Sequence, residues 1–278
     1  MKENKTNDIK LLIGLLALLL VILYIPMFIN LYNWWENDPN YGHGLFIPLA
    51  SAFLVWRKRK ILKGTPKKPE VKLSIALFII SFFLYVIGSK IELFRLCIIS
   101  FLMSSFAFSL FFFGWGVVKE LAFPLGFMVF MIPIPRLDDL TAPMKLFASW
   151  ISAGFLKFVG LSVYREGNVI MLPKFTLEVA TACSGLKSLV LVTTLSVFYG
   201  YLFLAKNTQR ILLFLLSVPI AIIANIARII TVGLISNILS TQALFHFVHD
   251  FSGVFVFIVA GVLLALTSGI LERCKFQK

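Results

Sequence analysis

The chain has 278 residues, of which 59% are hydrophobic and only 14% are charged. Apolar stretches long enough to cross a bilayer recur along its whole length, which excludes an ordinary water-soluble globular protein. The 26 Lys and Arg residues outnumber the 13 Asp and Glu residues, and we interpret this excess as the orientation signal of a membrane protein, not as a nucleic-acid surface. Membrane lipids are therefore expected partners, and nucleic acid is not.

Eight apolar segments, taken at about 20 residues per crossing, predict an all-α polytopic membrane protein. The first segment is too long for the core of a signal peptide, so we expect it to remain as a span. The predicted spans cover residues 10–30, 42–56, 73–89, 93–113, 117–135, 183–204, 211–237 and 250–271. No internal repeat is visible, and residues 1–278 are predicted to form a single integral membrane domain.

The orientation follows from the loop between the second and third predicted spans. This segment, RKRKILKGTPKKPEVK (57–72), carries eight Lys or Arg residues and one Glu. Such a density of positive charge resists translocation and holds the loop in the cytoplasm. With an even number of spans, both termini are then cytoplasmic, in a multi-pass protein of the cell (inner) membrane.

The long outer segment 136–182 carries two further predictions. Lys145 and Lys157 flank an apolar stretch that is too short to cross the bilayer twice, which favours an interfacial or re-entrant helix. The following run, YREGNVIMLPKFTLEV (164–179), alternates polar and β-branched residues around Gly167-Asn168, which predicts a small strand pair. The predicted fold is therefore about eight transmembrane helices with a small extracytoplasmic β-containing segment.

Three reactive side chains from different predicted spans share one depth. Cys183 starts the sixth span from the outside, and His249 immediately precedes the eighth. Arg228 lies 17 residues beyond the inner start of the seventh span, a rise of roughly 25 Å in a hydrocarbon core about 30 Å thick. An intramembrane arginine is costly and is by default a functional hypothesis.

Such a set suits acyl transfer through a thiol. A thiolate attacks a carbonyl, an imidazole activates the cysteine, and a fixed cation stabilises the oxyanion or orients the substrate. Each residue also has a simpler interpretation: Cys183 as a packing residue, Arg228 as a cation that snorkels to the interface, and His249 as an ordinary polar rim residue. Cys97 is expected to be a packing residue, and so is Cys274.

Several ordered sequence blocks resemble the exosortase/archaeosortase family of integral-membrane transpeptidases. The resemblance extends over most of the chain, and the last three blocks contain Cys183, Arg228 and His249. The blocks are YGHGLFIPLASAFLVWRKRK (41–60), FMIPIP (130–135), LTAP (140–143), REGNVIMLP (165–173), LEVATACSGLKSL (177–189), PIAIIANIARI (219–229) and HDFSGVFVF (249–257).

The resemblance implies a function and assigns roles. Cys183 would be the nucleophile, Arg228 the arginine of the Asn-x-x-Arg block, and His249 the histidine four residues before Gly253, with the catalytic helices at 183–271 and the active site at the extracytoplasmic face. The implied substrates are exported proteins with a C-terminal sorting tail of the PEP-CTERM type. The acceptor would be water or a surface polysaccharide or lipid, and no cofactor is expected.

Three alternatives remain open at this point. A polytopic transporter or a component of extracellular polysaccharide export would also have many spans, although transporters tend to show internal repeats and polar groups near the midplane. A purely structural membrane scaffold does not explain Arg228. A metal site formed by His246, His249 and Cys183 is conceivable, because residues at i and i+3 face one way on a helix.

Overall fold

The computed structural model describes residues 2–37, 42–133, 137–173, 176–178, 186–238 and 242–273, and leaves undescribed the side chains of 2–10, 137–141, 178, 186–187, 236–238 and 242–253. The chain divides into two compact units, Met1–Pro133 and Ile134–Lys278. We describe each unit by itself.

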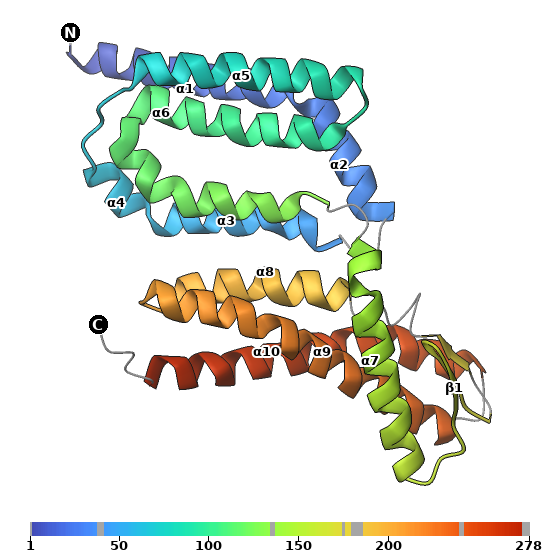
Figure 1. The fold of residues 1–278 in the computed structure, drawn as a ribbon. Helices are drawn as coiled ribbons and strands as arrows, with labels where there is room; N and C mark the ends of the chain where they lie inside the picture. The colour runs from blue at the N-terminus through green and yellow to red at the C-terminus, as the bar shows by residue number, and fades with distance from the viewer. Residues whose placement is uncertain are drawn as a thin grey trace. The chain divides into compact units, whose positions relative to one another are not determined.

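Both units are mostly helical (Figure 1). In the first unit the elements are α1 (Lys2–Leu23), α2 (Ile25–Asn37), the 3-10 helix η1 (Gly42–Leu45), α3 (Phe46–Arg57), α4 (Arg59–Gly64), α5 (Val71–Lys90), α6 (Phe94–Phe127) and η2 (Met128–Met131). In the second unit they are α7 (Leu137–Phe158), β1 (Tyr164–Glu166), β2 (Val169–Met171), β3 (Thr176–Glu178), α8 (Leu186–Phe203), α9 (Asn207–Ile238) and α10 (Gln242–Arg273).

Helices α1 and α2 form one bent element with a break at Tyr24. Their axes differ by 55°, and Pro26 in the first turn of α2 accounts for the break, because proline has no N–H and clashes with the preceding turn. Tyr24 is almost fully buried, and its hydroxyl group bonds to the Ser100 and Ser104 hydroxyls of α6. Ser104 donates in turn to the Ser81 hydroxyl of α5 at 2.8 Å. This hydroxyl network joins the three helices.

Helix α6 covers nearly all of the fourth predicted span (93–113) and the first part of the fifth (117–135), and it is interrupted between them. At Gly114 the backbone has φ 75° and ψ −177°, so the helical conformation is lost there, and the ribbon turns sharply in Figure 1. Lys68 of the basic segment forms an isolated parallel bridge with Gly114. A Cβ at Gly114 would lie 1.7 Å from the Lys68 carbonyl oxygen, so only glycine fits both the backbone angle and the space.

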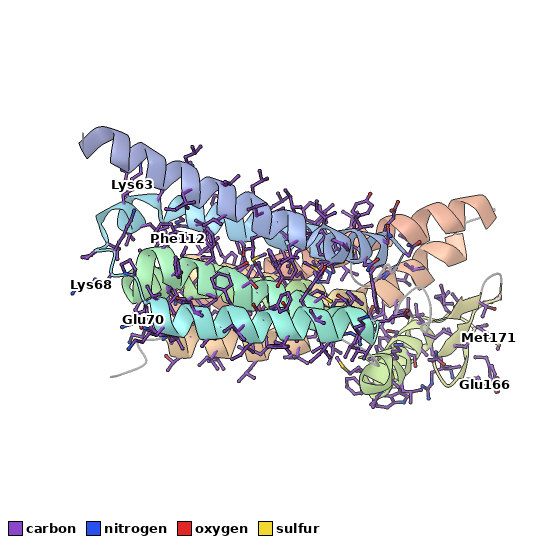
Figure 2. All side chains as sticks on the ribbon, turned by 90° about the horizontal axis from the view of Figure 1, so that it is seen from above. Lys63, Lys68, Glu70, Phe112, Glu166 and Met171 are labelled. Atoms are coloured by element: carbon purple, nitrogen blue, oxygen red, sulfur yellow. The ribbon has the colours of Figure 1, made fainter. Side chains whose placement is uncertain are left out.

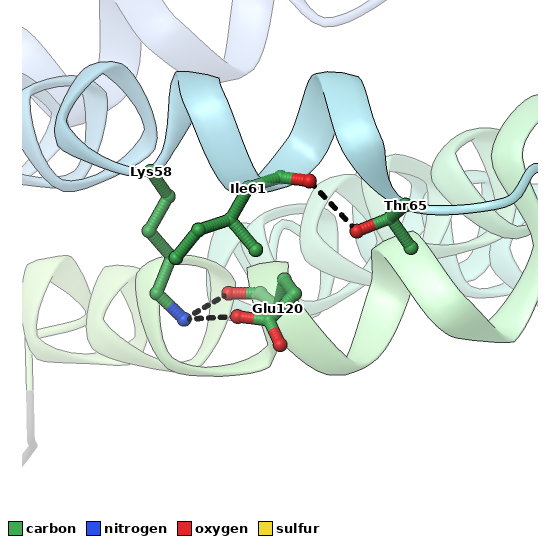
Figure 3. Close-up of polar contacts among 4 residues, drawn as sticks. All are labelled: Lys58, Ile61, Thr65 and Glu120. Carbon is green, nitrogen blue, oxygen red and sulfur yellow. Dashed lines mark hydrogen bonds and ion pairs between the residues drawn. The ribbon is translucent and has the colours of Figure 1, made fainter.

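A proline and a lysine connect the second half of α6 to the end of α3. Pro124 cannot donate to the carbonyl of Glu120, four residues earlier. Lys58 Nζ donates to that carbonyl at 2.8 Å and forms an ion pair with the Glu120 carboxylate at 2.9 Å (Figure 3). The Lys58 side chain thus supplies the hydrogen bond that Pro124 cannot donate to the Glu120 carbonyl. It also neutralises the Glu120 carboxylate.

In the second unit, α9 packs against α7, α8 and α10. Helices α8, α9 and α10 lie side by side, and α7 runs steeply across their direction (Figure 1). Gly233 allows the close crossing of α7, since a Cβ there would lie 2.7 Å from a methyl carbon of Leu156. The exposed side of α7 carries large apolar side chains, among them Phe147, Trp150 and Phe158.

The predicted strand pair is present and has a third strand. The sheet is antiparallel in the order β1-β2-β3. Gly167 has φ 59° at the first position of the two-residue β1–β2 turn, where a type II′ turn requires a positive φ. Arg165 Nη1 donates to the Gly167 carbonyl at 2.8 Å and to Ser149 Oγ of α7 at 3.2 Å, which fixes the hairpin to α7.

The helical, membrane-spanning class is confirmed, whereas the count of eight spans is not established. Four described helical segments are long and apolar enough to cross a membrane, namely Val71–Lys90, Phe94–Met131, Asn207–Ile235 and Val254–Arg273, and the bent pair α1–α2 would make five. Most of two predicted spans, 93–113 and 117–135, falls within the single segment Phe94–Met131. The predicted span 42–56 is divided between the 3-10 helix η1 and the 12-residue α3, and the apolar part of α8 is the short Ser188–Phe203.

Candidate active site

Helix α9 carries two polar residues where three neighbouring helices meet it. Asn225 is 3% exposed, and Arg228 is half-buried one turn later. Residues three apart lie on one side of a helix, so the amide and the guanidinium lie on the same face. The apolar neighbours Ala224 and Ile229 are almost fully buried. The two polar side chains therefore lie within a packed region of α9.

The Asn225 side chain has an unusual environment. Its Oδ1 atom is buried and has no hydrogen-bond partner among the described residues. A buried acceptor without a donor costs about 1–3 kcal/mol, and native structures contain few such groups. The sequence analysis did not single out Asn225 as a site residue, although the Asn-x-x-Arg block contains it. The only sequence signal was its spacing from Arg228.

The ends of α8, α9 and α10 that lie away from Arg228 are tied together by short contacts. Gln209 Nε2 donates to the Leu271 carbonyl at 2.7 Å, which joins the start of α9 to the end of α10. At the α8–α9 connection, a Cβ at Gly200 would lie 3.7 Å from Arg210 Cα. These contacts set the register of the three helices, which alternate in direction along the chain.

This register shows at which level along the helix axes the other predicted site residues lie. Arg228 lies 19 residues beyond Gln209, or about 28 Å along α9, and the same rise from Leu271 reaches Ser252 of α10. His249 therefore lies within α10 about one turn beyond the level of Arg228. The same reasoning can start from the contact between Gly200 and Arg210. It puts Leu186, the first residue of α8, about one turn below the level of Arg228.

The structure brings only part of the predicted site into view. Arg228 is described with its side chain, whereas for His249 and His246 only the helical backbone is described. Cys183 lies outside the described residues, three positions before α8. No group of three His, Cys, Asp or Glu side chains suited to a metal ion occurs among the described residues, and the alternative metal site of Cys183, His246 and His249 lies outside them.

The early His-Gly motif takes a structural position in the first unit. Gly44 of η1 is buried against Trp35 of α2, and a Cβ there would lie 2.1 Å from Trp35 Nε1. The adjacent His43 is half-buried. The glycine of this motif thus allows the end of α2 to pack directly on η1.

Together these features define a multi-pass helical membrane protein with polar groups buried on one helix of its C-terminal unit. The family model of the transmembrane exosortases (Exosortase_EpsH) matches residues 34–266, and the chain belongs to this family. Membership implies a role in the sorting of PEP-CTERM proteins. No curated protein and no solved structure gives a significant match. The matched range contains Cys183, Arg228 and His249.

Proposed function

We propose that this exosortase is a cysteine transpeptidase that cleaves the C-terminal sorting tail of exported proteins through a thioester at Cys183. The observation that carries the proposal is the level of Arg228 along α9, compared with the start of α8 and with His249 of α10. Helix α8 begins about one turn below this residue, and the three residues that precede Leu186 span at most about 10 Å. Chain length therefore allows Cys183 to reach the level of Arg228, and the backbone of His249 in α10 lies near the same level.

The proposed reaction has two steps. In acylation, the Cys183 thiolate attacks the scissile carbonyl carbon, Arg228 donates hydrogen bonds to the oxyanion, and the C–N bond breaks as protonated His249 gives its proton to the leaving amine. In the second step, an acceptor hydroxyl, amine or water attacks the thioester while His249 takes up the proton of the nucleophile. The carbon–sulfur bond then breaks, and the Cys183 thiolate is regenerated.

Asn225 is assigned a positioning role in this scheme. Its buried Oδ1 accepts no hydrogen bond from the described residues, so a donor is needed to offset the cost of its burial. A substrate backbone N–H is a suitable donor once substrate entry parts the side chains that cover this atom. An amide on the same helix face as Arg228 would hold the sorting motif while the guanidinium binds the oxyanion.

The proposed topology has eight crossings, cytoplasmic termini and an extracytoplasmic site. The bridge between Lys68 and Gly114 supports it, because the turn of α6 then lies beside the basic segment that is held in the cytoplasm. Helix α7 runs across the direction of α8–α10 (Figure 1) and exposes Phe147, Trp150 and Phe158. Such a helix suits the outer membrane interface, close to Arg228 through its crossing at Gly233.

The decisive experiment is replacement of Cys183 by alanine, scored by immunoblot of a co-expressed protein with a PEP-CTERM tail. We expect normal membrane insertion and no tail cleavage. Cys97→Ala is the matched control, since Cys97 is a buried residue of α6 beside Ser89 and Tyr85 and should leave cleavage unchanged. Continued cleavage by the Cys183 variant would eliminate thioester catalysis.

A further inference from the structure

An apolar groove lies on the first unit between α1, α5 and α6. Its volume is about 420 Å³, and it is open on one side. The lining consists of leucine and phenylalanine side chains only: Leu16, Leu19, Leu20, Leu23, Phe78, Phe108, Phe111 and Phe112. The groove therefore has the surface chemistry of a hydrocarbon-binding site, without a polar side chain in its lining.

Positive charge lies close to the groove, separated from its lining by the Phe113 ring. The Lys67 ammonium lies over the Phe113 ring, 5.3 Å from its centroid, and Phe113 contacts the groove residue Phe112 at a centroid distance of 6.4 Å. Figure 2 shows the labelled Lys63, Lys68 and Phe112 at the same end of this unit. All three lysines are exposed.

The basic segment is held in this position by its backbone. Lys68 forms its bridge with Gly114, and the Glu70 amide donates to the Leu110 carbonyl at 3.2 Å. Thr65 and its neighbour Pro66 lie against Gly116, since a Cβ there would lie 3.0 Å from the Thr65 methyl carbon. These contacts therefore hold the backbone of Lys67 and Lys68 against α6.

The groove and the lysines also share one leaflet. Phe108 and Phe112 lie six and two residues before Gly114, or about 9 and 3 Å along α6 from the level of the basic segment. Phe78 lies seven residues after the start of α5, or about 10 Å. These distances are less than half of a ~30 Å hydrocarbon core, so a single lipid can reach both features.

The charge balance at this end is strongly positive. Segment 57–72 has eight Lys or Arg residues against Glu70, and the nearby Glu120 is engaged by Lys58. An anionic headgroup beside such a segment is favoured by about 1 kcal/mol for each lysine. A zwitterionic headgroup lacks this net attraction.

We propose that this groove and the lysines beside it form a binding site for an anionic phospholipid. One acyl chain lies against the groove-lining leucines and phenylalanines, and the phosphate of the headgroup binds Lys67 and Lys68. A transmembrane peptide that ends in a basic cluster is a less suitable occupant, because the lysines beside the groove would repel its positive charges. The proposal is independent of the catalytic scheme.

The test is native mass spectrometry of the full chain in detergent, with dioleoyl phosphatidylglycerol and dioleoyl phosphatidylcholine in competition. We expect preferential retention of phosphatidylglycerol. Lys67→Gln with Lys68→Gln should lower the relative affinity for it roughly thirtyfold, or about fivefold for each lysine. The control pair Lys90→Gln with Lys157→Gln removes the same charge from exposed positions elsewhere and should retain the preference.

A second variant tests the groove without a change of charge. Leu19→Trp places a bulky ring in the groove, whereas Leu18→Trp places it at an exposed position of α1 outside the lining. Only Leu19→Trp should displace phosphatidylglycerol. Equal retention of the two lipids by the wild-type protein, equal behaviour of the two lysine pairs, or equal behaviour of the two tryptophan variants would each overturn the proposed site, as would displacement of the lipid by a basic-ended transmembrane peptide.

Discussion

Two buried polar groups, one in each unit, differ in how their hydrogen-bonding capacity is used. In the first unit the Tyr24 hydroxyl bonds to Ser100 and Ser104, and Ser100 also donates to the Ser81 carbonyl at 2.6 Å. In the second unit the Asn225 amide oxygen is equally buried and has no partner among the described residues. A satisfied network contributes to folding, whereas an unsatisfied group opposes it. We therefore assign stability to the Tyr24 network, and we expect a functional role for the Asn225 amide because it also lies one turn from Arg228 on the same helix face.

The largest effect expected from this comparison is at His249 of α10. His249→Ala should lower tail cleavage by roughly 1000-fold, because it removes the proposed general acid and base. His246→Ala should cause only a modest loss. Trapping of the acyl-enzyme at Cys183 in isolated membranes provides the measurement. An inactive His246 variant beside an active His249 variant would shift the assignment by one turn of α10.

Arg228 tests whether the second unit needs more than positive charge. Arg228→Lys keeps the charge but loses the planar set of donors that the oxyanion requires, so we expect roughly a 100-fold loss of cleavage rate. Arg210→Lys is the control on the same helix, where Arg210 Nε bonds to the Leu204 carbonyl at 2.9 Å. Near-normal cleavage by the Arg228 variant would reduce this residue to an electrostatic role.

Asn225 tests the comparison most directly, because its two effects should have opposite signs. Asn225→Leu removes a buried acceptor and should raise the free energy of unfolding by about 1–3 kcal/mol. Cleavage should fall roughly tenfold, the value of one hydrogen bond to substrate. Thermal unfolding and cleavage are measured on the same preparation.

The control for Asn225 is Thr194→Val. Thr194 Oγ1 on α8 is also buried without a partner among the described residues, but it lies eight residues beyond Leu186, about 12 Å further from the site. The Thr194→Val variant should have a higher free energy of unfolding than the wild-type protein and should cleave the sorting tail at the same rate. A stability loss in Asn225→Leu would show that this amide supports the fold, and the contrast between the two units would fail.

The smallest effect on activity is expected at Tyr24. Tyr24→Phe removes the hydroxyl at the centre of the first-unit network, which should lower the free energy of unfolding by about 1–2 kcal/mol and leave cleavage unchanged. Tyr32→Phe, at an exposed position of α2, is the control and should change neither quantity. Loss of cleavage in the Tyr24 variant at full stability would give the first unit a catalytic role.

Apolar length and turn chemistry predicted the regular parts of the fold. The expected span 73–89 corresponds closely to α5, 211–237 lies within α9, and the Gly167-Asn168 turn forms the predicted hairpin. The break at Tyr24 was not predicted, although Pro26 signals it. The sharp turn of α6 falls at Gly114, beside the expected boundary between two spans, but hydropathy alone does not show that helical structure resumes at once.

The candidate site was less accessible to sequence reasoning. Arg228 was found because a charge in an apolar run is conspicuous. Asn225 was missed because its significance depends on burial without a partner, which is a property of the packing of α9 and is not visible in an apolar sequence. The assignments of Cys183 and His249 rest on the resemblance and remain predictions, since their side chains lie outside the described part of the chain.

The close approach at Gly114 has a consequence for genetic screens of this protein. Any side chain there would collide with the Lys68 carbonyl oxygen and would require a left-handed backbone angle. A saturation library scored by tail cleavage would therefore show Gly114 to be as intolerant as Cys183, even though it takes no part in the reaction. Protein abundance in the membrane would separate the two positions, because substitutions at Gly114 would remove the protein and substitutions at Cys183 would leave it in place.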